Sequence, residues 1–232
     1  MQLAIDTSTD TASVALVKDN EILAELTWRC GQNHTTTLLP NLDALLRQTG
    51  TGIQAVEAII VAKGPGSYNG LRVGISAAKG LALSLGVPLV GINTLAAAAY
   101  PHAATGLPVC PILSAGRGEI STALYQMKDG DLRQILAEEI TTMETLCPRL
   151  EAETVFCGEL TPPVIEYLRE HLKQKAIIAA PSARLRRAGP LAELGLKQIA
   201  AGKLDDPATL HPSYLRRPNI TKPRKNNITM GR

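Results

Sequence analysis

Histidine and cysteine, the side chains that most often bind metal ions or attack a substrate, are few and dispersed in this 232-residue sequence. No two of the four histidines lie within four residues of each other, so no helix presents a zinc-binding pair. No cysteines are spaced C-x-x-C, and no G-x-S-x-G segment presents a serine nucleophile. The sequence therefore predicts no metal site, and it predicts reduced thiols at Cys30, Cys110, Cys147 and Cys157.

A glycine-rich turn at residues 64–66 (GPG) lies between an apolar strand and a helix, where free N–H groups and the helix dipole favour an anion. The turn does not match the dinucleotide motif G-x-G-x-x-G, because Gly70 comes one residue late and no acidic residue lies between Glu57 and Glu119. A Walker A loop would end in G-K-[ST], where this chain has GLR at 70–72. Both standard nucleotide-binding interpretations therefore fail.

A second candidate site is the end of the first predicted strand, where Asp6 is followed by Thr7, Ser8 and Thr9. A carboxylate at this position can hold a magnesium ion, or it can accept hydrogen bonds that cap the turn. Both interpretations stay open on the residue types alone. Taken together, the candidates for a vestigial nucleotide-binding site are Asp6, Thr7, Ser8, Gly64 and Gly66.

The elements that position these residues follow from the spacing of apolar side chains. In the first 105 residues, strands are predicted at 2–6, 12–17, 22–27, 56–62 and 89–92, and helices at 35–48, 71–85 and 94–100. After a boundary rich in proline and glycine, strands are predicted at 109–114, 119–126, 134–138, 154–157 and 176–179, and helices at 162–172 and 190–201. The two halves share a strand-strand-strand-helix pattern, which indicates a duplicated α/β fold.

Three segments are expected from this pattern: a lobe at residues 1–105, a second lobe at 106–212, and a basic, disordered tail at 213–232. Within the first lobe, the predicted helix 71–85 and the residue before it carry small side chains at steps of four, at Gly70, Gly74, Ala78 and Ala82. Such a stripe lets another element approach closely. It indicates either packing against the sheet of the same chain or an interface with a helix of another chain.

The net charge of +3 hides an uneven distribution. Residues 1–170 carry 11 basic and 18 acidic side chains, whereas residues 171–232 carry 13 basic and 3 acidic ones. Aromatic residues make up only 3% of the chain, which argues against an RNA-binding platform built on base stacking. The uncharged stretch 80–101 is interrupted by Gly86 and Pro88, and the N-terminus does not resemble a signal peptide. We therefore expect a cytoplasmic protein that does not enter a membrane.

Several short segments follow one another in an order that resembles a known family. They are DTST (6–9), SVAL (13–16), His34 with LP (39–40), GPGSYNGLRVG (64–74), AKGLA (78–82), PLVG (88–91) and YLR (214–216). These segments resemble the bacterial TsaB (YeaZ) family of tRNA threonylcarbamoyladenosine biosynthesis proteins. The resemblance covers residues 1–126 well, and the segment 64–74 is its most specific part.

The resemblance implies an α/β fold of two related lobes, of the actin-like and heat-shock-chaperone-like ATPase type with ribonuclease H-like lobes. It implies a non-catalytic scaffold that binds the catalytic paralogue TsaD and acts with the ATPase TsaE. Their complex moves a threonylcarbamoyl group from its adenylate to the adenosine next to the anticodon of tRNAs that read ANN codons. A homodimer is expected when the partner is absent.

Differences from catalytic relatives support the non-catalytic interpretation. The paralogue follows Gly-Val-Asn with a His-Met-Glu-Gly-His metal motif, whereas residues 91–98 here read GINTLAAA. ATP-using relatives carry Asp-x-Gly in the phosphate loop, and the side chain of Ser8 in the glycine position would crowd a phosphate. We therefore expect no catalytic residues and no cofactor. Within the family, Ser114 stands where aspartate is usual, while Arg117 and Glu119 keep their places.

The resemblance places the partner or dimer interface on the first-lobe helices. The residues expected there are His34, Leu38, Leu39, Leu42, Tyr68, Gly70, Leu71, Arg72, Gly74, Ile75, Ala78, Lys79 and Ala82. The basic C-terminal quarter has two interpretations, a solubilising surface or an attraction for tRNA phosphates through Arg184, Arg186, Arg187, Arg216 and Arg217. The rival functional hypothesis is a stand-alone ATP-binding kinase or ATPase of the same fold, which would use Asp6 and the turn 64–66.

Overall fold

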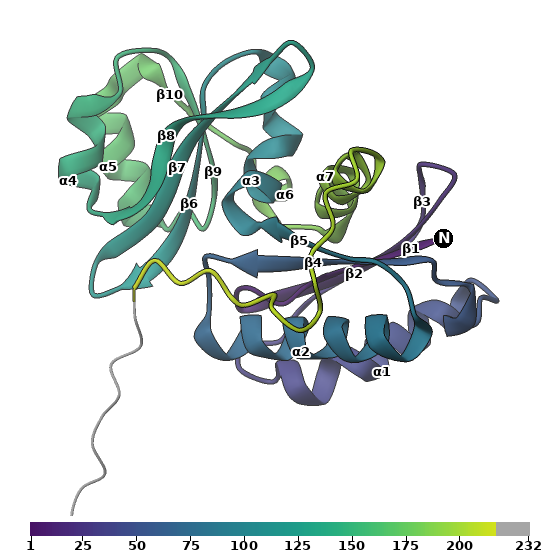
Figure 1. Cartoon of the computed structure of the whole chain (residues 1–232). Helices are drawn as coiled ribbons and strands as arrows, with labels where there is room; N and C mark the ends of the chain where they lie inside the picture. The colour runs from purple at the N-terminus through teal and green to yellow at the C-terminus, as the bar shows by residue number, and fades with distance from the viewer. Residues whose placement is uncertain (217–232) are drawn as a thin grey trace, which may run out of the picture.

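Two five-stranded sheets lie side by side in the computed structural model, which describes residues 1–216 (Figure 1). The first sheet has the order β3-β2-β1-β4-β5. Its strand β1 pairs antiparallel with β2 and parallel with β4. The bounds are β1 (Gln2–Asp6), β2 (Thr11–Lys18), β3 (Glu21–Arg29), β4 (Ala58–Gly64) and β5 (Leu89–Asn93), which confirms the five strands predicted for the first half.

The second sheet repeats the connectivity of the first. Its order is β10-β9-β6-β7-β8, so its first strand, β6, again pairs antiparallel with the next strand and parallel with the fourth. The bounds are β6 (Val109–Gly116), β7 (Glu119–Lys128), β8 (Asp131–Thr141), β9 (Thr154–Gly158) and β10 (Ala176–Ile178). The duplicated two-lobe α/β fold expected from the sequence is therefore confirmed.

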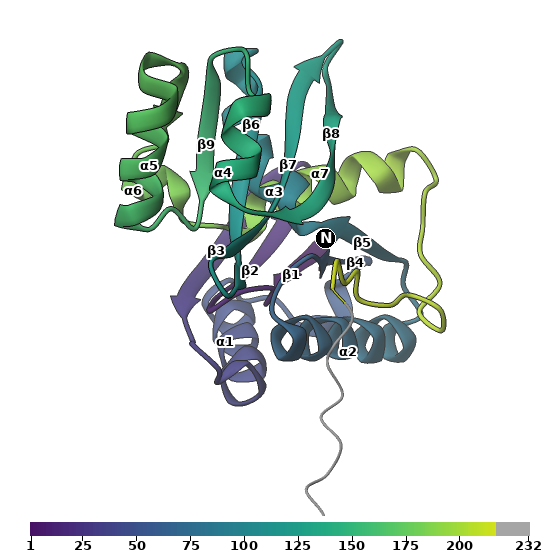
Figure 2. The ribbon, with the colours of Figure 1, turned by 90° about the vertical axis from the view of Figure 1, so that its left-hand side faces the viewer.

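Helices cover both faces of the first sheet. Helices α1 (His34–Gln48) and α2 (Tyr68–Leu85) lie on one face, and α7 (Ala188–Ala200) lies on the other (Figures 1 and 2). The continuous apolar run of β4 reflects this arrangement, because a strand covered on both sides has no solvent face. Its Ile59 and Val61 side chains pack in the core with α1 and α2, whereas Ile60 and Ala62 pack in the core with α7.

The second sheet is covered by shorter helices. Helices α4 (Met143–Leu146) and α5 (Pro162–Leu172) pack on one face around the buried ring of Phe156. Helix α3 (Thr94–Ala99) packs on the opposite face, and α6 (Pro181–Arg184) precedes the return of the chain to the first lobe. Nowhere in residues 1–216 does a helix combine the length and the hydropathy that a membrane crossing requires.

The predicted boundary of the second lobe at residue 212 is wrong. Helix α7 packs on β1, β2, β4 and β5, so residues from 188 onward belong to the first lobe. The following segment stays there, because Leu210 is buried in the first-lobe core and the N–H of Ser213 donates to the carbonyl of Lys63 at 2.6 Å. Both faces of the first sheet are apolar, and the face opposite α1 and α2 is covered by α7, which lies more than 90 residues after the last strand of that sheet. Residues 213–216 of the predicted disordered tail are therefore packed, and 217–232 lie outside the described residues.

Candidate functional site between the lobes

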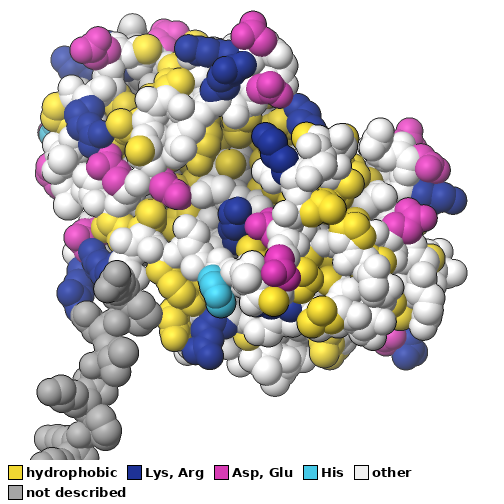
Figure 3. Space-filling model, in the orientation of Figure 1, with side chains coloured by type: hydrophobic (Ala, Val, Ile, Leu, Met, Phe, Trp, Pro, Cys, Tyr) yellow, Lys and Arg dark blue, Asp and Glu magenta, His cyan; other side chains and the backbone are white. Residues whose placement is uncertain are grey.

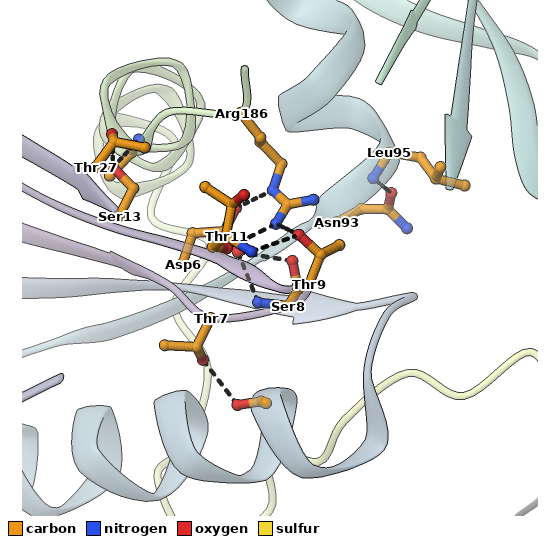
Figure 4. Close-up of polar contacts among 12 residues, drawn as sticks. Asp6, Thr7, Ser8, Thr9, Thr11, Ser13, Thr27, Asn93, Leu95 and Arg186 are labelled. Carbon is orange, nitrogen blue, oxygen red and sulfur yellow. Dashed lines mark hydrogen bonds and ion pairs between the residues drawn. The ribbon is translucent and has the colours of Figure 1, made fainter. Parts of the chain in front are cut away.

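Asp6 lies at the end of β1, where the first sheet meets the cleft between the lobes, and its side chain is only 1% exposed. One carboxylate oxygen, Oδ1, accepts hydrogen bonds from the backbone N–H of Ser8 at 2.9 Å and from its hydroxyl at 2.6 Å. The other, Oδ2, accepts a hydrogen bond from Nε of Arg186 at 2.6 Å (Figure 4). Both oxygens are therefore held by the protein itself, and the turn-capping interpretation of Asp6 is correct.

Arg186 reaches Asp6 from the segment between α6 and α7, where the chain returns from the second lobe to the first. Its Nη2 donates to the hydroxyl of Thr9 at 2.6 Å and to the carbonyl of Thr11 at 3.4 Å (Figure 4). The side chain is 7% exposed. The expectation that Arg186 contacts tRNA is therefore wrong, because its guanidinium is buried in an ion pair.

The glycine-rich turn between β4 and α2 is packed against the protein backbone. A Cβ atom at Gly66 would overlap the carbonyl oxygen of Ser8, and one at Gly64 would overlap the carbonyl oxygen of Ser213. The N–H of Ser67 donates to the carbonyl of Ser8 at 2.7 Å, so it does not point at a free anion. These glycines are needed for close approach of chain segments, and the contacts leave no room for a phosphate between the turn and Ser8.

The stripe of small residues on α2 packs inside the first lobe, and the alternative of a free interface face is wrong. Cβ atoms at Gly70 and Gly74 would overlap the backbone oxygen and the hydroxyl of Thr7, respectively. The Thr7 hydroxyl donates to the carbonyl of Gly70 at 2.7 Å, and His34 Nε2 donates to the carbonyl of Thr9 at 2.7 Å. Helices α1 and α2 thus both make hydrogen bonds to the turn that follows Asp6.

The predicted interface residues divide into a buried and an exposed set. His34, Leu38, Leu42, Gly70, Leu71, Gly74, Ile75, Ala78 and Ala82 are buried in the lobe. Leu39, Tyr68 and Arg72 are exposed, and Lys79 is half-buried. Leu83, which the sequence analysis did not include, is 70% exposed and follows Lys79 by four residues on the same side of α2. We call Leu39, Tyr68, Arg72, Lys79 and Leu83 the outer helical face.

A cavity of about 400 Å³ opens between the lobes, next to the glycine-rich turn at residues 64–66. Thr9 and Ser67 of the first lobe, Ser114 and Glu159 of the second, and the C-terminal Arg216 lie on its wall. The N–H of Ser114 donates to Glu159 Oε2 at 2.8 Å, so the residue that replaces the usual aspartate is held by a neighbouring carboxylate. The carboxylate and hydroxyls of this wall suit hydrogen-bonding or cationic groups better than a polyphosphate.

The remaining arginines expected to contact tRNA are engaged within the protein. Arg184 donates to the carbonyl of Leu160 at 2.9 Å, Arg187 pairs with Glu25, and Arg216 pairs with Glu119. Figure 3 shows acidic side chains interspersed with basic ones on one face of the molecule. Arg217 lies outside the described residues. Neutralised arginines attract phosphates weakly, so the folded part of the basic quarter is a poorer tRNA surface than its sequence indicates.

The four cysteines are free, and the structure also buries all four of them. Burial raises the pKa of the Cys110 thiol to about 12 and that of Cys147 to about 11, which keeps both protonated at neutral pH. Burial also lowers the pKa of His102, although its bond to the carbonyl of Ala183 opposes this shift. Within residues 1–216, no three His, Cys, Asp or Glu side chains gather in a way that could hold a metal ion.

A family model described as TsaD, tRNA N6-adenosine threonylcarbamoyltransferase, matches residues 28–221. The tRNA threonylcarbamoyladenosine biosynthesis protein TsaB of Bacillus subtilis (strain 168) is 34% identical over 218 residues, which are 92% of this chain and 93% of that protein. The chain belongs to the TsaB family.

Solved structures agree with membership of the TsaB family. YeaZ from Pseudomonas aeruginosa is 26% identical and has a TM-score of 0.79, over 93% of this chain and all of that chain. An activator of 2-hydroxyisocaproyl-CoA dehydratase from Clostridium difficile, solved with bound ADPNP, has a TM-score of 0.50 at 10% identity, over 86% of this chain and 97% of that chain. The second likeness, at 10% identity, concerns the fold alone.

Proposed function

We propose that this chain is the non-catalytic partner subunit of TsaD in tRNA threonylcarbamoyladenosine biosynthesis. Membership of the TsaB family supports this role. The observation that carries it is the Asp6–Arg186 ion pair, because the carboxylate that would serve a nucleotide site is buried and already bound by the protein. A chain built in this way contributes surface to a complex, and the chemistry of the transfer belongs to TsaD.

The outer helical face is the docking surface in this proposal. Leu39 and Leu83 are 57% and 70% exposed, so each helix presents a large apolar side chain to solvent. Tyr68 and Arg72 add an aromatic ring and a guanidinium, the residue types most enriched where binding energy concentrates. A standard interface buries about 800 Å² on each partner, which two helices of this length can supply. The same face forms the homodimer when the partner is absent.

The further components of the proposal are the ATPase TsaE and tRNA. The described arginines of the basic quarter are largely engaged in ion pairs or buried, so in this proposal tRNA attraction falls to the basic residues from Arg217 onward. This contribution is non-specific, since Lys and Arg near phosphates act mainly through charge. The role places the protein in the cytoplasm with the tRNA pool.

Co-expression tests the proposal most directly. TsaD and TsaE of the same genome would be produced with and without this chain, and the modified adenosine in total tRNA would be measured by mass spectrometry. We expect modification only when the chain is present. Equal modification in its absence would overturn the assignment as a required subunit.

The rival hypothesis of a stand-alone ATPase is disfavoured by the contacts around Asp6 and Gly66. Calorimetry of the isolated protein with ATP and magnesium distinguishes the two. Micromolar binding that is lost in Asp6→Ala would support the rival, whereas the proposed function predicts no binding at this site.

A further inference from the structure

A nucleotide with its magnesium ion, which the fold suggests next to Asp6, does not fit the residues that surround this carboxylate. Oδ1 of Asp6 accepts two hydrogen bonds from Ser8, Oδ2 accepts one from the Arg186 guanidinium, and the backbone of Gly66 lies against Ser8. The place of a metal ion beside the carboxylate is taken by a guanidinium that comes from 180 residues away in the sequence. The cation in this cleft is therefore part of the chain.

We propose that Arg186 is a built-in ligand of the candidate nucleotide site at Asp6, and that its guanidinium takes the place of an exogenous cation and fixes the segment that crosses between the lobes on the first lobe without nucleotide. The inference goes beyond the proposed function, because it concerns what occupies the cleft and not what docks on the helices. It assigns a ligand class, the guanidinium cations, to the acceptors of Asp6, Thr9 and Thr11.

The geometry of the contact matches the fixed donor arrangement of a guanidinium group. Nε binds Asp6 Oδ2, while Nη2 binds the hydroxyl of Thr9 and reaches the carbonyl of Thr11. Donors fixed in one plane meet three separate acceptors on a single turn, which a lysine ammonium at the end of a flexible chain does not reproduce. Since both partners are buried, the arginine cannot be removed without leaving an uncompensated carboxylate.

The neighbouring Arg187 shows that this contact is not an ordinary ion pair of the segment. Arg187 also binds a first-lobe carboxylate, Glu25, but its side chain is 55% exposed. Glu25 is itself 8% exposed, but the guanidinium end of this pair is open to solvent, so the pair is screened more than the Asp6–Arg186 pair, in which both side chains are buried. Arg186 and Arg187 are thus adjacent arginines on the same crossing segment, one inside the cleft and one outside, and they form a matched pair for experiment.

The experiment is chemical rescue. Arg186→Ala and Arg187→Ala would be compared by thermal denaturation in buffer, in millimolar methylguanidinium chloride, and in sodium chloride of the same ionic strength. We expect Arg186→Ala to lower the Tm by about 10 °C, and methylguanidinium but not sodium chloride to restore part of this loss. The wild type and Arg187→Ala should show no such gain. A folded Arg186→Ala that methylguanidinium does not stabilise would overturn the proposal.

A second comparison applies if Arg186→Ala does not fold. Arg186→Met alone leaves the Asp6 charge buried, whereas Asp6→Asn with Arg186→Met removes both charges. The double variant should have the higher Tm if the arginine acts by neutralising Asp6. A double variant no more stable than the single one would contradict the assignment.

Discussion

The ring of Tyr214 packs on the ring of Tyr68 with centroids 5.2 Å apart and planes inclined by 31°. Tyr68 belongs to the outer helical face, and its hydroxyl accepts a hydrogen bond from Arg72 at 3.1 Å. Two residues further on, Arg216 pairs with Glu119 of the second lobe. The C-terminal segment therefore joins the start of α2 to the second lobe at the surface, whereas Arg186 fixes the crossing segment to the first lobe in the interior.

The C-terminal segment should contribute measurably to the stability of the first lobe. Leu210 is buried in the core formed with α1 and α2, so Leu210→Ala should lower the free energy of unfolding by about 2–5 kcal/mol. Leu204→Ala, at an exposed position of the same segment, should change it by less than about 0.5 kcal/mol. Urea denaturation measures both. Equal effects would show that the segment is not packed as described.

Two glycines of α2 should respond in opposite directions to the same change. Gly74→Ala introduces a Cβ that overlaps the Thr7 hydroxyl, and we expect it to destabilise the fold by about 1–3 kcal/mol. Gly80→Ala meets no atom within 4 Å and should stabilise the helix by up to about 1 kcal/mol. Thermal denaturation of the two variants provides the comparison, and a loss of stability in Gly80→Ala would contradict this orientation of α2.

Partner binding should depend on the outer helical face and not on the buried stripe. Leu83→Asp places a charge at the proposed contact without disturbing the core, and we expect at least about a tenfold higher Kd for TsaD. Leu185→Asp, at an exposed position between α6 and α7, is the control and should leave the Kd unchanged. Titration calorimetry supplies both values. An unchanged Kd in Leu83→Asp would move the docking surface elsewhere.

A chain that ends at Arg216 keeps the packed C-terminal segment and removes residues 217–232, which carry five basic and no acidic side chains. If these residues attract tRNA phosphates, the affinity of the complex for tRNA should fall less steeply with salt after truncation. Arg187→Ala should leave the slope unchanged, because Arg187 is paired with Glu25. Filter binding across a salt series measures the slope, and an unaltered slope in the truncated chain would rule out this role.

The buried thiol of Cys110 should make stability fall at alkaline pH. Burial raises its pKa from 9.0 to about 12, so the unfolded thiol ionises first and the stabilisation is lost as the pH rises from 9 towards 12. The wild type loses this stabilisation between pH 8 and 10, whereas Cys110→Ala has no thiol to ionise there. The free energy of unfolding of the wild type should therefore exceed that of Cys110→Ala by about 1 kcal/mol less at pH 10 than at pH 8. Urea denaturation at both pH values tests this. A difference that stays constant would contradict the burial of the thiol.

Local patterns were sufficient for most helices and strands, because apolar periodicity reports burial directly. They were insufficient for α7, since its apolar face does not say which sheet it covers. They also failed for Arg186, because the run RLRR at 184–187 is typical of an exposed basic cluster. In the structure Arg186 is buried, whereas the adjacent Arg187 is exposed. The stripe on α2 was ambiguous for a related reason, because its partner, Thr7, lies in a turn more than sixty residues earlier.

The return of α7 to the first sheet has a consequence for synthesis on the ribosome. All five strands of that sheet have been translated by residue 93, but one face stays uncovered until residues 188–200 emerge from the exit tunnel. At about 5–20 residues per second, the interval lasts on the order of ten seconds. During that time the nascent chain exposes the apolar side chains of β1 and β4 that α7 later covers, and trigger-factor-like chaperones would find their binding surface there.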